Sequence, residues 1–458
     1  MPPPAAPAAG LPDSLPGRVR VGYALGSLVT GAFGTVPGLL LLPYLTDTLG
    51  VGAGVAGLLV MGPKAWDVIL NPIAGRISDR TRGPLGARRP YLLGAGLALA
   101  ALFALLFAAP FGASGPLPAA YVALAFLASA SAFAFYQVPY VAMPAEMTAG
   151  YAERTRLMTL RVAVLALAIL LAGAASPLVV KAAGGGVAGH RAMGASVAAL
   201  IALGALGSFF GTAGVPAGPA LESEPSLREQ LRVVGQSGPF VRLFACFVVQ
   251  AAGVATMLAG VKYFAAQILA SPDEGPTVLF ACFVAPALFV MPLWARVGAR
   301  VGKLRAYVLA SCLFAGGAAL LLFTRRLPAG GIYAIVAVIG GGYAGQQVFG
   351  LAMLPDCIAY DAARRGRRQA GVFTGLWAAG ETLGQALGPA VFAAVLEAFG
   401  YLPSSTGAAA AQSETAKLGV LLGFTLLPAA VVASALFFLR GYDLDERRLA
   451  EAEAAARR

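Results

Sequence analysis

The chain has 458 residues, of which 59% are hydrophobic and only 12% carry a charge, and its mean hydropathy is +0.77. Soluble globular domains have roughly 25% charged residues, so this composition excludes an ordinary soluble protein and indicates a membrane protein. The net charge of +12 would suggest a nucleic-acid partner, but the basic residues fall in short loops between apolar runs. We therefore expect the lipid bilayer as a partner and no nucleic acid.

Twelve apolar runs are long enough to cross a bilayer as helices, which takes about 20 residues each. In the first half of the chain they are 19–43, 52–77, 90–111, 119–146, 157–182 and 192–215. In the second half they are 240–270, 277–298, 305–324, 329–356, 369–398 and 416–439. The sequence therefore predicts an all-α membrane protein with twelve transmembrane helices.

Lysine and arginine are unevenly distributed between the two sets of loops. One set, which includes both termini, holds the dense clusters 76–89, 296–305 and 364–368. The opposite loops hold about five basic residues: Lys181, Arg191, Arg325, Arg326 and Lys417. Because basic loops stay in the cytoplasm, both termini should be cytoplasmic, as an even number of spans requires. We predict a multi-pass protein of the cytoplasmic membrane.

The domain organisation follows from these runs. Residues 18–215 and 240–440 are the predicted N-terminal and C-terminal halves, with six helices each, and 216–239 is the predicted cytoplasmic linker. Residues 1–17, rich in proline and alanine, are a predicted disordered cytoplasmic tail. Residues 441–458, in which acidic and basic residues alternate, are a predicted cytoplasmic helical tail.

Nothing in the sequence predicts an enzyme, a cofactor or a metal site. The cysteines are Cys246, Cys282, Cys312 and Cys357, all in apolar runs without metal-ligand spacing, and we interpret them as buried thiols. No glycine-rich phosphate loop follows a strand, since the glycines lie inside apolar helices. The lone His190 falls at an outer loop and has no assigned role.

The two halves of the chain resemble each other. Residues 86–93, GARRPYLL, correspond to 302–309, GKLRAYVL, and residues 142–146, AMPAE, correspond to 352–356, AMLPD. Two six-span halves repeated in one orientation resemble the major facilitator superfamily, whose substrate site lies near the membrane midplane between the halves. The resemblance covers nearly the whole chain and implies the major facilitator fold.

Four short segments carry a closer resemblance. They are Trp66-Asp67 with Pro72 and Gly75, the hairpin DRTRGPLGARRP at 79–90, Val138-Pro139-Tyr140, and Leu354-Pro355-Asp356. These segments resemble the glycoside–pentoside–hexuronide:cation symporters, the family of the melibiose permease. The resemblance implies a secondary active transporter that moves a sugar, glycoside or related small solute by alternating access together with a cation. We expect it to work as a monomer.

Lys64 and Asp67 lie one helical turn apart within a predicted span, where a charge normally faces a partner or a water-filled cavity. In the resembling symporters, the aspartate of the Trp-Asp motif contributes to the coupling-cation site with a second acidic residue one turn later. Here that second position is Asn71. The alternative, that Asp67 only neutralises Lys64 at i,i+3 spacing, stays open.

The available ligands favour a proton over sodium as the coupling ion. Hard cations prefer several carboxylate and carbonyl oxygens. Asp67 and Asn71 together supply only one carboxylate and one amide. The position in the fourth span that matches a threonine ligand of the resembling symporters is Ala134. Glu381 can supply a second titratable group, or it can be a packing carboxyl paired with Lys262. We predict coupling to H+, with Na+ as the alternative.

The candidates for the substrate cavity share an aromatic face, an amide or another polar group within a predicted span. They are Trp66, Tyr136, Gln137, Tyr140, Arg161, Gln250, Lys262, Tyr263, Gln347, Trp377, Thr382 and Gln385. For the tyrosines and glutamines the alternative is an interhelical hydrogen bond, and Lys262 can instead snorkel to the surface. The resemblance implies a place near the cavity for Arg161 and puts Thr382 where relatives have a lysine. Resembling galactoside carriers have an aspartate where this chain has Gly31, so a galactoside is disfavoured.

A last group lies at the cytoplasmic ends of the spans, too far from the midplane to bind substrate: Asp79, Arg80, Arg88, Arg89, Glu146, Arg305 and Asp356. We expect these residues to lock helices at a cytoplasmic gate through charge-assisted hydrogen bonds, with Asp356 bonded to the arginines of 364–368. Arg161 can pair with Glu146 in this gate instead of lining the cavity.

Other functions stay open beside sugar symport. The apolar first span is compatible with a lysolipid or another amphipathic solute. The same fold can also serve a uniporter or an efflux carrier. A non-transporting membrane receptor is a more distant alternative.

Overall fold

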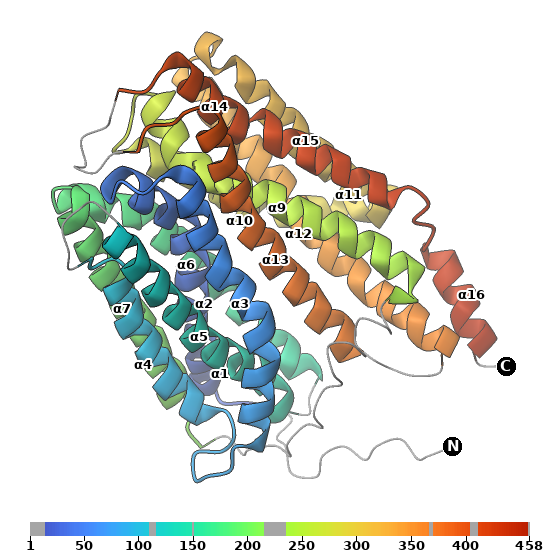
Figure 1. Ribbon diagram of the computed structural model, residues 1–458. Coiled ribbons are helices and arrows are strands. Elements are labelled where there is room, and N and C mark those ends of the chain that lie inside the picture. The colour runs from blue at the N-terminus through green and yellow to red at the C-terminus, as the bar shows by residue number, and fades with distance from the viewer. Residues whose placement is uncertain are drawn as a thin grey trace. The chain divides into compact units, whose positions relative to one another are not determined.

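The computed structural model describes residues 14–109, 116–148, 151–214, 235–365, 370–403 and 411–456, and these ranges contain helices and turns but no strand (Figure 1). The chain divides into two compact units. Unit 1 comprises Met1–Val51, Gly62–Ser223 and Ser404–Ala409, and unit 2 comprises Gly52–Met61, Glu224–Pro403 and Ala410–Arg458.

Unit 1 is built from long helices. Its elements are α1 (Gly17–Leu25), α2 (Ser27–Val36), the short π-helices η1 (Pro37–Leu41) and η2 (Tyr44–Thr48), the part of α3 (Ala53–Arg80) that follows Met61, α4 (Arg89–Leu106), α5 (Pro116–Met147), α6 (Tyr151–Ala182) and α7 (Gly186–Gly211). The first predicted span is interrupted at Gly26, between α1 and α2. A Cβ there would lie 2.4 Å from the ring of Tyr140, so only glycine allows this contact. Pro37 and Pro43 then remove two backbone donors further along the span.

Unit 2 repeats this construction. Its elements are α9 (Gly238–Gln267), α10 (Gly275–Val301), α11 (Lys303–Leu320), the 3₁₀-helix η3 (Leu321–Arg326), α12 (Ala329–Arg365), α13 (Ala370–Ala398), α14 (Glu414–Phe424), α15 (Leu426–Ala435), the 3₁₀-helix η4 (Leu436–Leu439) and α16 (Glu446–Ala456). The last predicted span consists of α14, α15 and η4. Its break lies at Thr425, whose hydroxyl donates to the Leu421 carbonyl (2.7 Å).

Each of the twelve predicted spans coincides with one helix or with adjoining helices. Among the described residues, eleven helices are long and apolar enough to cross a membrane. The predicted span outside this set, 369–398, corresponds to α13, which has polar residues near its middle. Its 29 residues extend over about 43 Å, more than the hydrocarbon core of about 30 Å. The predicted all-α membrane fold is confirmed.

Small residues let helices approach until their backbones touch. A Cβ on Gly22 of α1 would lie 2.4 Å from the Gly211 Cα at the end of α7. In unit 2, a Cβ on Gly388 of α13 would lie 2.3 Å from the Cβ of Ala255 on α9. Larger side chains at either glycine would separate the helices. Such contacts favour association in lipid, where burial of apolar surface supplies no driving force.

The first turns of α3 pack on α13 within unit 2. Gly57 faces Ala393, where a Cβ would approach to 2.6 Å, and the Gly54 N–H donates to the carboxylate of Glu397 (2.9 Å). The predicted N-terminal half at 18–215 included this segment. Through these contacts Gly52–Met61 clusters with unit 2, while the rest of α3 clusters with unit 1.

The tail beyond the last span contains the helix α16, which lies beside α12 in unit 2 (Figure 1). Before it, Tyr442 and Leu444 are buried, and the Tyr442 hydroxyl lies 3.5 Å from the sulfur of Cys357. The Asp445 carboxylate accepts a hydrogen bond from the backbone N–H of Arg448 (2.8 Å), which satisfies a donor in the first turn of α16. The tail is therefore packed against its unit through apolar side chains.

The predicted orientation can be tested by cysteine labelling in a variant without the native cysteines. A cysteine replacing exposed Pro84 should react with a membrane-impermeant maleimide only from the cytoplasmic side, and one replacing exposed Ala183 only from outside. Intact cells and inverted vesicles supply the two accessible sides. A variant that keeps only the buried Cys246 should react from neither side. Reaction of positions 84 and 183 from the same side would contradict the predicted topology.

Candidate functional site

The intramembrane pair of α3 is buried: the exposed fractions are 8% for Lys64 and 6% for Asp67. Spacing i,i+3 puts both residues on one face of the helix, and Lys64 interacts with the Asp67 carboxylate through its charge. Asp67 Oδ1 is buried and accepts no hydrogen bond from any residue that the structure describes. An ionised carboxylate buried without its hydrogen bonds costs several kcal/mol. This oxygen is therefore a position where a proton or a cation can bind.

Three further candidates of unit 1 keep accessible polar surface. Trp66 is 38% exposed, and its indole N–H donates to the hydroxyl of Ser131 on α5 (3.2 Å). Asn71, one turn after Asp67, and Gln137 on α5 are half-buried. Asn71 and Gln137 can therefore offer a hydrogen bond to a solute, whereas Trp66 can offer the face of its ring.

The two tyrosine candidates of α5 are buried, and their hydroxyls are used inside the unit. The Tyr140 hydroxyl donates to the Tyr23 carbonyl (2.8 Å) and is hydrogen-bonded to Ser27 (3.0 Å). The Tyr136 hydroxyl is hydrogen-bonded to Ser208 on α7 (3.1 Å). These bonds connect α5 with α1, α2 and α7. Tyr136 and Tyr140 thus have the interhelical role that was the alternative for tyrosines, and we leave them out of the candidate site.

Arg161 on α6 lies over the ring of Tyr140, with its guanidinium carbon 5.4 Å from the ring centroid. Its Nε is buried and has no hydrogen-bond partner among the residues described. A guanidinium held over an aromatic ring with a spare donor can bind an anionic or hydroxylated ligand. Arg161 therefore stays a cavity candidate. The side chain of Glu146, its alternative partner, lies outside the described part of the chain.

Three candidates of unit 2 are buried: Gln250, Tyr263 and Trp377. Gln250 donates to the hydroxyl of Ser311 on α11 (2.9 Å). Trp377 stacks on Phe247 with ring centroids 4.0 Å apart. Tyr263 packs against Phe392 at 5.4 Å. These contacts hold α9, α11 and α13 together and leave little surface for a solute.

The remaining candidates of unit 2 are half-buried: Lys262, Gln347, Glu381, Thr382 and Gln385. Glu381 on α13 interacts electrostatically with Tyr343 on α12, which stacks on Phe283 at 5.3 Å. The Thr382 hydroxyl donates to the Ala378 carbonyl (3.0 Å) and is therefore used within its own helix. Glu381 is the acidic group of this set.

The basic hairpin between α3 and α4 is anchored on both sides. The Arg88 guanidinium donates to the Ser78 hydroxyl (2.6 Å) on α3. Arg89 donates to the Phe209 carbonyl (3.0 Å) near the end of α7, and its guanidinium carbon lies 4.6 Å from the Phe209 ring centroid. Arg80 is exposed, and the side chain of Asp79 lies outside those described. Arg88 and Arg89 thus connect three helices of unit 1.

Asp356 on α12 pairs with Lys303 at the start of α11 (2.5 Å). Arg364, one of its predicted partners, instead lies over the ring of Tyr360, 5.7 Å from the centroid. Arg364 is two turns further along the same helix, whereas Lys303 approaches from the neighbouring helix, so Lys303 replaces it. Arg305 is exposed.

Two interactions in the structure were not predicted from the sequence. Glu153 at the start of α6 is only 2% exposed and accepts a hydrogen bond from Arg20 on α1 (2.6 Å). Arg191 on α7 donates to the carbonyl of Ala108 at the end of α4 (2.5 Å). Only two weak indications of these interactions were present in the sequence. One is the acidic residue of the segment ERTR, and the other is a basic residue in the set of loops that has few basic residues. His190 was predicted to lie at an outer loop. In the structure it is buried within α7.

Tyr136→Phe tests the structural role of the buried hydroxyl. One such hydrogen bond contributes about 0.5–1.5 kcal/mol, so the melting temperature of the detergent-solubilised protein should fall by about 1–3 °C. Tyr333→Phe is the matched control, because Tyr333 is half-exposed and its hydroxyl bonds to no described residue. Its melting temperature should equal that of the wild type. Equal effects of the two changes would contradict the structural assignment.

Residues 22–446 match the family described as MFS/sugar transport protein. The chain is 27% identical over 449 residues to the uncharacterized symporter YnaJ of Bacillus subtilis (strain 168), covering 94% of this chain and 92% of that protein. It is 24% identical over 455 residues to the isoprimeverose transporter of Lactiplantibacillus pentosus, with 96% and 92% covered. The solved structure of a bacterial homologue of the human drug peptide transporters PepT1 and PepT2 superposes with a TM-score of 0.66 at 15% identity, covering 93% of this chain and 97% of that one.

Proposed function

Since the chain belongs to the MFS/sugar transport protein family, we propose that it carries a sugar, glycoside or related small solute across the cytoplasmic membrane together with a cation. As a member of that family it is a multi-pass membrane transporter of small molecules and not an enzyme. The proposed orientation has both termini in the cytoplasm. Symport requires a group whose charge changes with the transport step, and Asp67 is the group that we assign to it.

The observation that carries the proposal is the buried carboxylate oxygen of Asp67 without a hydrogen bond from the described residues. Burial disfavours the ionised form of Asp67, and the nearby charge of Lys64 acts against this effect and favours the ionised form. A movement that separates the two charges would favour the protonated form instead. Coupling follows because the same carboxylate would then bind a proton in one state of the transporter and release it in another.

A proton is favoured over sodium by the ligands near Asp67 in the chain. The residue one turn later is the neutral Asn71, and Ala134 on α5 has no oxygen in its side chain. A hard cation needs several oxygens, whereas a proton needs one carboxylate. Glu381 in unit 2 supplies a second titratable group inside a span.

The substrate class is supported by the names of similar proteins and by the side chains that keep polar surface. One similar protein is named an isoprimeverose transporter. The side chains that can hydrogen-bond a hydroxylated solute are Gln137, Arg161, Gln347 and Gln385. Trp66, whose N–H donates to Ser131, can contribute its exposed ring. Position 31 adds a restriction, because a Cβ on Gly31 would lie 2.7 Å from the Cβ of Ala168 on α6. An aspartate at position 31 would require the helices to move apart. We therefore propose that this chain binds its solute without the carboxylate that resembling galactoside carriers have at this position.

The test is transport in sodium-free proteoliposomes made with the full-length protein. A panel of pentosides, glucosides and hexuronides is added, and uptake of solute and of protons is recorded together. A transported solute should drive proton uptake. Asp67→Asn should abolish this proton uptake, because the amide of asparagine does not take up a proton near neutral pH. The variant should keep its fold, since the change preserves the side-chain volume.

Asp273→Asn is the control, the same substitution at an exposed position between α9 and α10. It should leave solute and proton uptake unchanged. Strict dependence on a sodium gradient without proton movement would overturn the choice of ion. If Asp67→Asn lowers only the yield of folded protein, and the surviving protein still couples solute to protons, the pair is structural and the assignment of Asp67 fails.

A further inference from the structure

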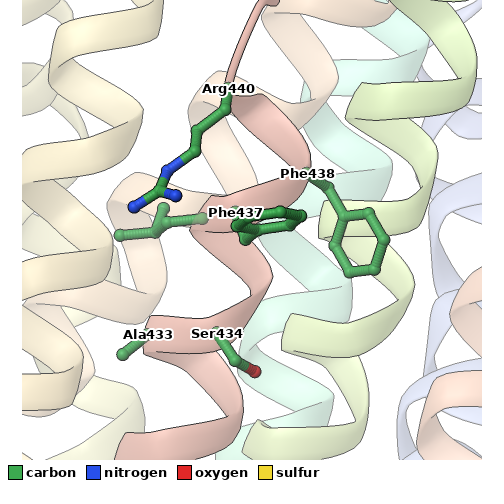
Figure 2. A pocket seen from close by; sticks show the side chains of 6 residues that line it. Ala433, Ser434, Phe437, Phe438 and Arg440 are labelled. Carbon is green, nitrogen blue, oxygen red and sulfur yellow. The ribbon is translucent and has the colours of Figure 1, made fainter.

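A groove of about 600 Å³ lies on the surface of the last span where it ends. Its lining consists of Ala433, Ser434, Leu436, Phe437, Phe438 and Arg440. Figure 2 shows Arg440 and the two phenylalanines at one end of the groove and the small side chains of Ala433 and Ser434 at the other. Phe437 is 63% and Phe438 42% exposed. An apolar surface is thus open to the bilayer beside a cation.

The local backbone explains why the cation sits beside the aromatic ring. The chain passes from α15 into the 3₁₀-helix η4, and 3₁₀ geometry brings residues i and i+3 into line. Arg440 therefore lies over Phe437, with its guanidinium carbon 5.0 Å from the ring centroid. Such a cation–π contact holds the charge at the level of the ring and leaves its N–H groups available.

The donors of Arg440 have no acceptor among the residues described, and its side chain is exposed. A second exposed arginine, Arg242 of α9, donates to the carbonyl of Gly441, the next residue in the chain. The carboxylate that follows, Asp443, is already paired with Arg448. The end of the groove is therefore positively charged and has unused hydrogen-bond donors.

We propose that this groove binds one anionic phospholipid of the inner leaflet. Arg440 holds the phosphate, Arg242 adds its charge, and an acyl chain lies along Phe437, Phe438 and the small residues below them. A guanidinium can bind phosphate with two parallel hydrogen bonds. The inner leaflet carries anionic lipids and attracts basic residues at the cytoplasmic ends of spans. The inference rests on the proposed orientation, which puts this end of the span at that leaflet.

The lipid is preferred over a free anion because the groove is mainly apolar. The Ser434 hydroxyl, its other polar side chain, donates to the Val431 carbonyl (2.8 Å) and is used within the helix. A phosphate ion would contact the charged end alone and leave the phenylalanine rings in contact with hydrocarbon. Only a ligand with both a charged head and an apolar chain matches the whole lining.

Native mass spectrometry of the full-length protein in mild detergent tests the site, with phosphatidylglycerol, phosphatidylethanolamine and inorganic phosphate as probes. The wild type should retain one phosphatidylglycerol more tightly than phosphatidylethanolamine. Arg440→Gln should weaken its retention by about fivefold or more. Ala433→Trp should also weaken it, because the indole fills the groove while the charge remains. Arg447→Gln is the matched control, an exposed arginine of α16 already paired with Glu451 at 2.9 Å, and should behave as the wild type.

Equal retention of phosphatidylglycerol by the wild type and by both groove variants would overturn the proposal. So would equal binding of the two lipids, or displacement of the lipid by inorganic phosphate at the concentration expected for a simple anion site. If Arg440→Gln does not fold, Ala433→Trp alone decides. The measurement needs no transported solute, so an error in the proposed symport activity would leave its outcome unchanged.

Discussion

The hydrocarbon core of a bilayer contains no water that could satisfy a polar group, and the arrangement of polar side chains in this protein follows from that constraint. Serine and threonine hydroxyls donate to a carbonyl one turn earlier in their own helix, as in Ser129, Ser176, Thr256, Ser311 and Thr425. Tyr23 and Tyr140 instead reach each other's carbonyls across two helices. The carboxylate oxygen of Asp67 departs from this rule. It is a buried polar atom without a hydrogen bond from the described residues, and this makes Asp67 the group to which we assign proton binding.

The same constraint separates polar residues that hold helices together from those that can meet a solute. Gln250 and Tyr136 are both polar, yet their hydrogen bonds to Ser311 and Ser208 are used to join helices. Gln137 and Gln385 are of the same chemical kind but only half-buried. Polarity within a span therefore does not identify a binding residue. What distinguishes the two groups is burial: Gln250 and Tyr136 are enclosed by neighbouring helices, whereas Gln137 and Gln385 keep accessible surface.

The sequence predicted the spans well because a membrane helix must be apolar along its length, whatever its neighbours are. Lys64 and Asp67 stood out for the same reason. Their surroundings could not be predicted in this way. Tyr136 and Gln137 are adjacent in the chain but differ in burial. The sequence does not distinguish the lipid-facing side of a helix from its packed side, because both sides consist mainly of apolar residues.

Partners distant in the chain were also beyond prediction. Asp356 bonds to Lys303, and Glu153 bonds to Arg20, across helices whose register only the folded structure defines. The first turns of α3 likewise join unit 2 through Gly57 and Ala393. A pattern along one helix carries information about its own period and length. It carries none about which opposite charge or small residue a second helix will present.

The tyrosine network has a consequence for the biosynthesis of unit 1. The Tyr23 hydroxyl lies in the first span, and the carbonyl that accepts its hydrogen bond follows 117 residues later, in the fourth. Chains emerge from the ribosome N-terminal part first, so the first span reaches the membrane before its native acceptor has been made. Until the fourth span arrives, the phenol has to remain near the water interface or against the insertion machinery. The hydrogen bonds between Tyr23 and Tyr140 can therefore form only after the fourth span has entered the bilayer beside the first.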